Sequence, residues 1–251
     1  MKKLVMFCVR VSQSFVRNDL HFFAGDITYK LLLSIFPLLI FGFAVIGFLH
    51  IDYTEAASFI EGITGMFPPG VMEIIENFVT EVISTRSGTL VSVSIITALY
   101  SSSSGFASMA RALSNCNGGG DTRNWVHRRL LGIFLSLLFV GIIVAVMVFL
   151  VFSRGFGQMM LSVLTVFIII ILIYKVGSCK KISVVQVVPG ACITVIGWMG
   201  LSLLFNVYVR NFSNFTVVYG SLGGIFILLV WINMMTMILL WGAEVNAQLQ
   251  R

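Results

Sequence analysis

The stretch 221–248, SLGGIFILLVWINMMTMILLWGAEVNAQ, has the length and composition of a helix that crosses a membrane. Its one charged side chain, Glu244, lies near the C-terminal end. About 20 apolar residues are enough for a helix to cross a hydrocarbon core of about 30 Å. Five other segments have the same character, at about 22–50, 89–113, 130–152, 159–176 and 185–209. The sequence therefore predicts an all-α integral membrane protein with six transmembrane helices.

The overall composition agrees with this class. Of the 251 residues, 58% are hydrophobic and only 10% are charged, whereas charged residues make up about 25% of an average soluble domain. The whole chain, 1–251, is therefore predicted to be a single six-helix transmembrane domain. The four cysteines, Cys8, Cys116, Cys179 and Cys192, show no paired spacing. We accordingly expect no disulfide, no metal site and no cofactor.

The basic residues predict the orientation. If the six spans alternate across the membrane, thirteen of the 16 lysines and arginines fall on one side. These are Lys2, Lys3, Arg10, Arg17, Lys30, Arg111, Arg123, Arg128, Arg129, Lys175, Lys180, Lys181 and Arg251. Short loops rich in Lys and Arg stay in the cytoplasm, so both termini are predicted to be cytoplasmic. A basic inner face suits anionic lipid headgroups, and membrane lipids rather than nucleic acid are the expected partners.

Two segments outside the spans are predicted to be helical and amphipathic. In residues 1–20, Leu4, Cys8, Val11 and Phe15 recur at helical spacing, which predicts a helix in the inner membrane interface. The alternative is a frayed basic tail. In the extracytoplasmic segment 51–88, the apolar residues form one helical face, and the helix is expected to be either a lid or a surface-packed element. These residues are Val71, Ile74, Ile75, Phe78, Val82 and Ile83.

Polar residues of the second span form a stripe along one helical face, because they recur at spacings of three and four. They are Ser94, Thr97, Ser101, Ser104, Ser108 and Arg111. One interpretation is a hydrophilic substrate pathway, to which Asn206 and Asn233 of the fifth and sixth spans would contribute. The other is a seam of small residues that lets helices approach, with hydroxyl groups bonded to their own backbone carbonyls.

An inner charge cluster is predicted from Asp26, Lys30, Arg111 and Glu244, because the alternating helices place these residues at a similar depth. Charged groups within a membrane are costly and therefore pair or line wet cavities. We expect Arg111 to pair with Asp26 or with Glu244. The cluster would act either as a cytoplasmic gate or anion-facing site, or as a staple that holds the bundle together; alternatively, the charged side chains only snorkel to the membrane interface.

A further set of residues is predicted to shape helix packing. A proline within a span, Pro37, kinks the first helix unless neighbouring groups satisfy the carbonyl that it frees. Glycines in the fifth and sixth spans permit close approach of helices and also permit a homo-oligomer. They are Gly190, Gly220, Gly223, Gly224 and Gly242.

Three groups of residues carry a family resemblance: Tyr29, Ser34 and Pro37; Ser103, Gly105 and Arg111; and the run from Pro189-Gly190 through Tyr219-Gly220-Ser221-Leu222-Gly223-Gly224 to Gly242-Ala243-Glu244-Val245-Asn246-Ala247. Together they resemble the YihY/BrkB family over nearly the whole chain. The resemblance implies a six-span protein of the bacterial inner membrane with no agreed biochemical activity. Serum resistance and envelope lipid transport have been associated with the family. Trp231-Ile232-Asn233 departs from the family pattern, which leaves the role of Asn233 open.

The leading functional hypothesis is a transporter or flippase-like protein for a lipid or another amphipathic, anionic molecule. The alternative is a scaffolding protein of the cell envelope that performs no transport. The family has also carried a ribonuclease label, but the chain has three scattered histidines and no His-Glu-x-x-His or phosphate-binding motif. We therefore expect no enzymatic activity and no catalytic residue.

Overall fold

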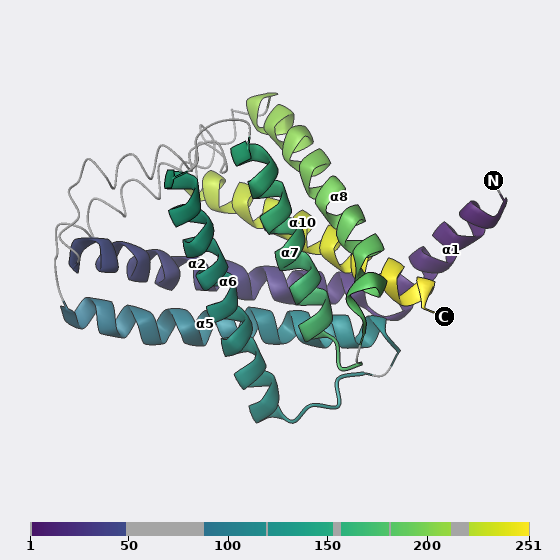
Figure 1. Ribbon diagram of the computed structural model, residues 1–251, viewed down its shortest axis with the longest axis horizontal. Helices are drawn as coiled ribbons and strands as arrows, with labels where there is room; N and C mark the ends of the chain where they lie inside the picture. The colour runs from purple at the N-terminus through teal and green to yellow at the C-terminus, as the bar shows by residue number, and fades with distance from the viewer. Residues whose placement is uncertain are drawn as a thin grey trace. The chain divides into compact units, whose positions relative to one another are not determined.

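The computed structural model describes residues 2–48, 88–118, 120–152, 157–180, 182–211 and 221–250. Within these ranges the chain forms seven helices and no strand. The helices are α1 (Lys2–Arg17), α2 (Leu20–Phe48), α5 (Gly88–Cys116), α6 (Trp125–Phe152), α7 (Gly157–Gly177), α8 (Val184–Asn211) and α10 (Ser221–Leu249), shown in Figure 1. The all-α prediction is therefore confirmed for the described residues. The predicted segment 51–88 lies outside them except for its last residue.

The long helices coincide with the predicted spans. Each observed end lies within five residues of the predicted one, and the largest difference is at the start of α6, which begins at Trp125 rather than at residue 130. The added turn forms because the amide of Arg128 donates to the carbonyl of Asn124, 3.0 Å away. The α2 helix runs through Pro37 as one element, Leu20–Phe48. The number of membrane crossings and their orientation stay predictions.

Among the residues that the structure describes with their side chains, two segments are both long enough and apolar enough to cross a membrane, Val184–Phe205 and Ile225–Leu249. Only 28% and 33% of their most apolar stretches are buried inside the protein. On α8, the side chains of Ile196, Leu203 and Leu204 are 69%, 71% and 72% exposed. Helices that expose so much apolar surface are typical of a protein surrounded by lipid rather than by water.

The chain divides into two compact units, each of which draws on distant parts of the sequence. Unit 1 comprises Met1–Thr28, Ser103–Leu201 and Asn233–Arg251, and unit 2 comprises Tyr29–Ser102 and Ser202–Ile232. Unit 1 contains the largest fully buried apolar side chains, which include Leu20, Ile27, Leu113, Ile170, Leu239 and Leu240.

A tight turn at Asn18 and Asp19 separates α1 from α2. The amide of Asn18 donates to the carbonyl of Ser14 at 2.9 Å and closes α1, and the carbonyl of Asp19 accepts from Phe22 and Phe23 at the start of α2. Asp19 has a φ of 54°, in the left-handed region that Asp tolerates better than most residues do. The turn brings the Asn18 side chain to the C-terminal end of α10.

The α1 helix differs from its predicted role in one respect. Val11 and Phe15, which were predicted to face the membrane interface, are only 2% and 5% exposed. The ring of Phe15 stacks on Trp241 of α10 with a centroid distance of 4.8 Å, and Figure 1 shows α1 beside the C-terminal end of α10. Half of the predicted lipid-facing surface therefore packs on protein, because the turn at Asn18 folds α1 back onto α10.

Candidate functional site

The C-terminal part of α10 is enclosed on all sides. The six consecutive residues Gly242–Ala247 are all buried, although a helix on a protein surface normally buries one face only. This block contains Glu244, which is 0% exposed, and Asn246, which is 4% exposed. Buried polar groups are stable only when they are hydrogen-bonded. These two buried side chains therefore need hydrogen-bond partners on the neighbouring parts of unit 1.

Asn246 binds the backbone of α8 beside a proline. Pro189 lies inside α8 and has no N–H to donate within the helix, so the regular hydrogen bonding is interrupted there. The next amide, Gly190 N, donates to Asn246 Oδ1 at 2.7 Å, and Asn246 Nδ2 donates to the carbonyl of Val187 at 3.1 Å. Both ends of one side-chain amide thus bind α8 at the interrupted turn.

The backbones of α8 and α10 touch at Gly190 and Gly242. A Cβ atom added to Gly190 would collide with the Gly242 carbonyl and with the amide of Asn246. A Cβ added to Gly242 would lie 2.6 Å from the Gly190 carbonyl oxygen and would also collide with the hydroxyl groups of Thr194 and Tyr174. The structure therefore brings together two of the glycines that were predicted to pack. Gly223 and Gly224 lie on α10, and Gly220 is outside the described residues.

Two further side chains tie neighbouring helices to α10. The hydroxyl of Tyr174 on α7 donates to the carbonyl of Leu239 at 2.6 Å and shares a hydrogen bond of 2.6 Å with Thr194 Oγ1. Trp198 Nε1 on α8 donates to the carbonyl of Met235 at 2.9 Å. The roles of Tyr174, Trp198 and Asn246 were not predicted from the sequence. The available signal was the pair Pro189-Gly190 inside the apolar α8 helix, because a proline there leaves backbone groups that need a polar partner.

Glu244 binds two amide side chains. Its Oε2 accepts a hydrogen bond from Asn18 Nδ2 at 3.1 Å, and its Oε1 accepts one from Gln248 Nε2 at 2.9 Å. Among the described residues, both carboxylate oxygens of Glu244 thus accept from amides, and the predicted pairing of Arg111 with Asp26 or Glu244 stays a prediction. Arg111 is half-buried, and among the described residues its Nε atom is buried without a hydrogen-bond partner. Asn18 was not foreseen as a partner, since its position depends on the turn after α1.

The remaining members of the charge cluster lie in different units. Asp26 is half-buried on the part of α2 that belongs to unit 1, and Lys30 belongs to unit 2. Both residues make polar or ionic contacts. The cluster of four charges as one site therefore stays a prediction.

The polar stripe lies on a single helix, α5, but its members have different environments. Ser108 is 1% exposed, and Ser104 and Arg111 are half-buried. In unit 2, Thr97 is exposed and its Oγ1 donates to its own helix at the Val93 carbonyl, 2.8 Å away. Ser101 is half-buried. The side chain of Ser94 lies outside the described residues.

The α5 helix packs closely against α6 near Ser103. A Cβ atom added to Gly132 of α6 would collide with the carbonyl of Ser103, so α5 and α6 are in close backbone contact there. Asn233 on α10 donates from Nδ2 to Thr28 Oγ1 on α2 at 3.3 Å. The predicted pathway residue Asn233 thus joins two helices of unit 1. The side chain of Asn206 is outside the described residues.

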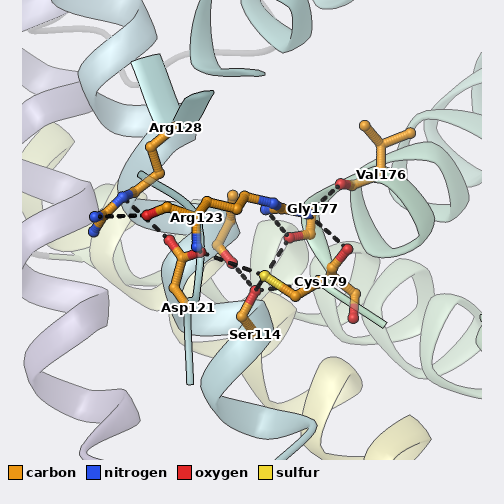
Figure 2. A network of polar contacts seen from close by, with 9 residues as sticks. Ser114, Asp121, Arg123, Arg128, Val176, Gly177 and Cys179 are labelled. Atoms are coloured by element: carbon orange, nitrogen blue, oxygen red, sulfur yellow. Dashed lines mark hydrogen bonds and ion pairs between the residues drawn. The ribbon is translucent and has the colours of Figure 1, made fainter. Parts of the chain in front are cut away.

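Figure 2 shows a second polar network, in which Arg123 caps the C-terminal end of α7. Arg123 Nη1 donates to the carbonyl of Gly177 at 2.9 Å, and Nη2 donates to Ser178 at 2.8 Å and to Val176 at 3.4 Å. The last carbonyls of a helix have no partner within the helix and carry a partial negative charge. The guanidinium group supplies both the missing donors and the compensating charge.

The same network holds the loop between α5 and α6 (Figure 2). Asp121 Oδ1 accepts from the Arg123 amide at 3.1 Å and from the Cys179 thiol at 3.3 Å. Asp121 Oδ2 lies 3.3 Å from Arg128 Nε in an ion pair whose carboxylate is 2% exposed. Ser114 Oγ donates to Cys179 Sγ at 3.2 Å. Several of the basic residues that predicted the orientation therefore also stabilise the loops.

Replacing Arg123 by alanine should lower the thermal stability of the detergent-solubilised protein by about 1–2 kcal/mol, since charge-assisted hydrogen bonds of a partly exposed group are lost. Arg123→Lys should recover less than half of that loss, because a single ammonium cannot reproduce the planar fork of donors. Thermal unfolding followed by intrinsic fluorescence measures the effect. Lys175→Ala, which removes an exposed cation from the last turn of α7, is the control. Equal shifts for the two alanine variants would contradict the capping role.

Comparisons with known proteins support the conclusion that the chain is a membrane protein. A family model described as virulence factor BrkB matches residues 11–251. A ribonuclease-like protein, YfkH, of Bacillus subtilis (strain 168) is 30% identical over 248 residues, which cover 91% of this chain and 89% of the relative. The UPF0761 membrane protein NT05HA_1801 of Aggregatibacter aphrophilus (strain NJ8700) is 26% identical, with 97% and 91% coverage. No solved structure matches the chain.

Proposed function

The chain belongs to the virulence factor BrkB family of bacterial membrane proteins. We propose that it moves an amphipathic, anionic molecule, such as a lipid, across its membrane. In this proposal the protein lies in the inner membrane with both termini in the cytoplasm. The polar stripe of α5 contributes the pathway, together with Asn206 and Asn233. Membrane lipids are its main partners.

The observation that carries the proposal is the state of Arg111. Its Nε group is buried and lacks a hydrogen-bond acceptor among the described residues. A buried donor of a charged group without a partner costs about 1–3 kcal/mol or more. An anionic group that reached this nitrogen would recover that free energy, and guanidinium groups bind phosphate and carboxylate with matching geometry. Ser108 and Ser104 lie one and two helical turns earlier on the same face of α5.

The test is lipid movement by purified protein in vesicles. A fluorescent phosphatidylglycerol is placed in both leaflets, and the fraction reduced by external dithionite is followed with time. Wild-type protein should expose the inner-leaflet lipid, and Arg111→Gln should slow this step by about 10- to 100-fold, since one charged hydrogen bond is worth about 1.5–3 kcal/mol. Arg111→Lys should retain an intermediate rate, because it keeps the charge but loses the fork.

The matched control is Lys175→Gln, which also removes one cation but from an exposed position. It should move lipid at the wild-type rate. Equal slowing in the two variants would assign the effect to net charge and contradict a specific role of Arg111. If wild-type vesicles move neither phosphatidylglycerol nor other anionic lipids, the transport proposal is wrong.

The second candidate function is a scaffold of the cell envelope. Within the chain, small residues allow close backbone contacts at Gly132 and at Gly190, and a scaffold would use the same kind of contact between copies, through Gly220 or Gly224. A scaffold would form assemblies that Gly220→Leu or Gly224→Leu disperses in native mass spectrometry, with no lipid movement by the wild type. The ribonuclease-like name belongs to YfkH. For this chain we propose no enzymatic activity, and incubation of the purified protein with RNA tests that statement.

A further inference from the structure

The α1 helix carries two separate apolar faces. The inward face, with Val11 and Phe15, is buried at 2% and 5% exposure. The second face, called the outward stripe, consists of Val5, Val9 and Val16, which are 59%, 47% and 61% exposed. These positions are four and seven residues apart, so they fall on one line along a helix.

The inward face sets the direction of the outward stripe. Phe15 stacks on Trp241, and Asn18 donates to the buried carboxylate of Glu244 at 3.1 Å. These contacts fix the rotation of α1 about its own axis relative to the end of α10. The outward stripe therefore cannot turn toward the protein without breaking both contacts.

Charge and length decide what can cover the stripe. Arg10 and Arg17 are exposed on one flank of it, next to Met6, which is 53% exposed. The helix has 16 residues, which gives a length of about 24 Å, shorter than a hydrocarbon core of about 30 Å. With a cation in its middle, α1 is unsuited to crossing the membrane. An apolar stripe flanked by cations matches the boundary between anionic headgroups and acyl chains.

We propose that the outward stripe docks on an anionic phospholipid surface, so that α1 lies between that surface and α10. Val5, Val9 and Val16 enter the headgroup–acyl boundary, and the guanidinium groups of Arg10 and Arg17 bind lipid phosphates. The inference assigns to the membrane a different face from the one that sequence periodicity suggested. It does not depend on whether the protein transports lipid.

The experiment uses the full-length chain, with its four cysteines replaced, in vesicles of phosphatidylcholine alone or with phosphatidylglycerol. An environment-sensitive fluorophore is attached to Val9→Cys, and a quencher is carried on the lipid at the depth of the glycerol group. In anionic vesicles the quenching should be at least twofold stronger than in neutral vesicles. In the Arg10→Gln, Arg17→Gln background the difference between the two vesicle types should disappear.

A label at Thr122→Cys, in the exposed loop before α6, is the control and should be quenched weakly in both vesicle types. If the Val9 label is quenched no more than the Thr122 label, the docking is wrong. Equal quenching of the Val9 label in the two vesicle types would overturn the anionic assignment. Disulfide-linked dimers formed through Val9→Cys, without quenching, would instead place a second copy of the chain on the stripe and would also overturn the proposal.

Discussion

Gly190→Ala should lower the unfolding free energy by about 3 kcal/mol or more, at or above the upper end of the range for overpacked cores. The added Cβ collides with the Gly242 carbonyl and the Asn246 amide. Relief requires α8 and α10 to separate, because the first of these groups is backbone. At 2–4 °C for each kcal/mol in a chain of this size, the midpoint of thermal unfolding should fall by about 6–12 °C. Size-exclusion chromatography after heating in detergent measures it.

Gly200→Ala is the matched control, since it makes the same change on the same helix. A Cβ atom at Gly200 meets no atom within 4 Å, and alanine is favoured over glycine in helices by about 1 kcal/mol. This variant should be as stable as the wild type or slightly more stable. Similar losses at Gly190 and Gly200 would mean that helix flexibility, rather than the contact with α10, determines the effect.

Asn246→Ala should lower the unfolding free energy by about 2–3 kcal/mol. It removes two buried hydrogen bonds, of 2.7 Å to Gly190 N and 3.1 Å to the Val187 carbonyl, and leaves a cavity between α8 and α10. Asn246→Asp should be at least as destabilising, because it buries a carboxylate whose second oxygen faces the Val187 carbonyl. The same thermal measurement applies to both variants.

Two comparisons sharpen the Asn246 prediction. Gln186→Ala loses a single hydrogen bond from the Ser183 amide at an exposed position of α8, and its effect should stay below about 1 kcal/mol. In the double variant of Gly190→Ala and Asn246→Ala, removal of the amide relieves part of the collision, so the combined loss should be smaller than the sum. A larger effect of Gln186→Ala than of Asn246→Ala, or strict additivity of the two losses, would contradict the role given to the two hydrogen bonds between Asn246 and α8.

The helices of this protein could be predicted from sequence because their signal is local. Apolar runs of about 20 residues separated by polar or glycine-containing loops mark α7, α8 and α10 to within a few residues. The contact of Gly190 with Gly242 was predicted only as a capacity for close packing. The glycine pattern shows that a helix can be approached, but it does not identify the partner.

The hydrogen bonds of Glu244 and Asn246 with other helices could not be predicted in the same way. Glu244 and Asn18 are 226 positions apart in sequence, and Asn246 and Gly190 are 56 apart. Helical periodicity places each side chain on a face of its own helix but leaves open which neighbour that face meets. Charge alone suggested that Arg111 pairs with Asp26 or Glu244, whereas the hydrogen bond from the Asn18 side chain to Glu244 depends on the turn at Asp19.

The all-helical class and the residue ranges of the described helices follow from the sequence, because both depend on the length and polarity of continuous segments. The face of α1 that packs on protein, the groups that bind Glu244 and Asn246, and the capping of α7 by Arg123 became apparent in the folded structure. These outcomes depend on how helices from distant parts of the chain meet. Hydrogen bonding then selects among partners that are equivalent in the sequence pattern, since each buried polar group must find a donor or acceptor within about 3 Å.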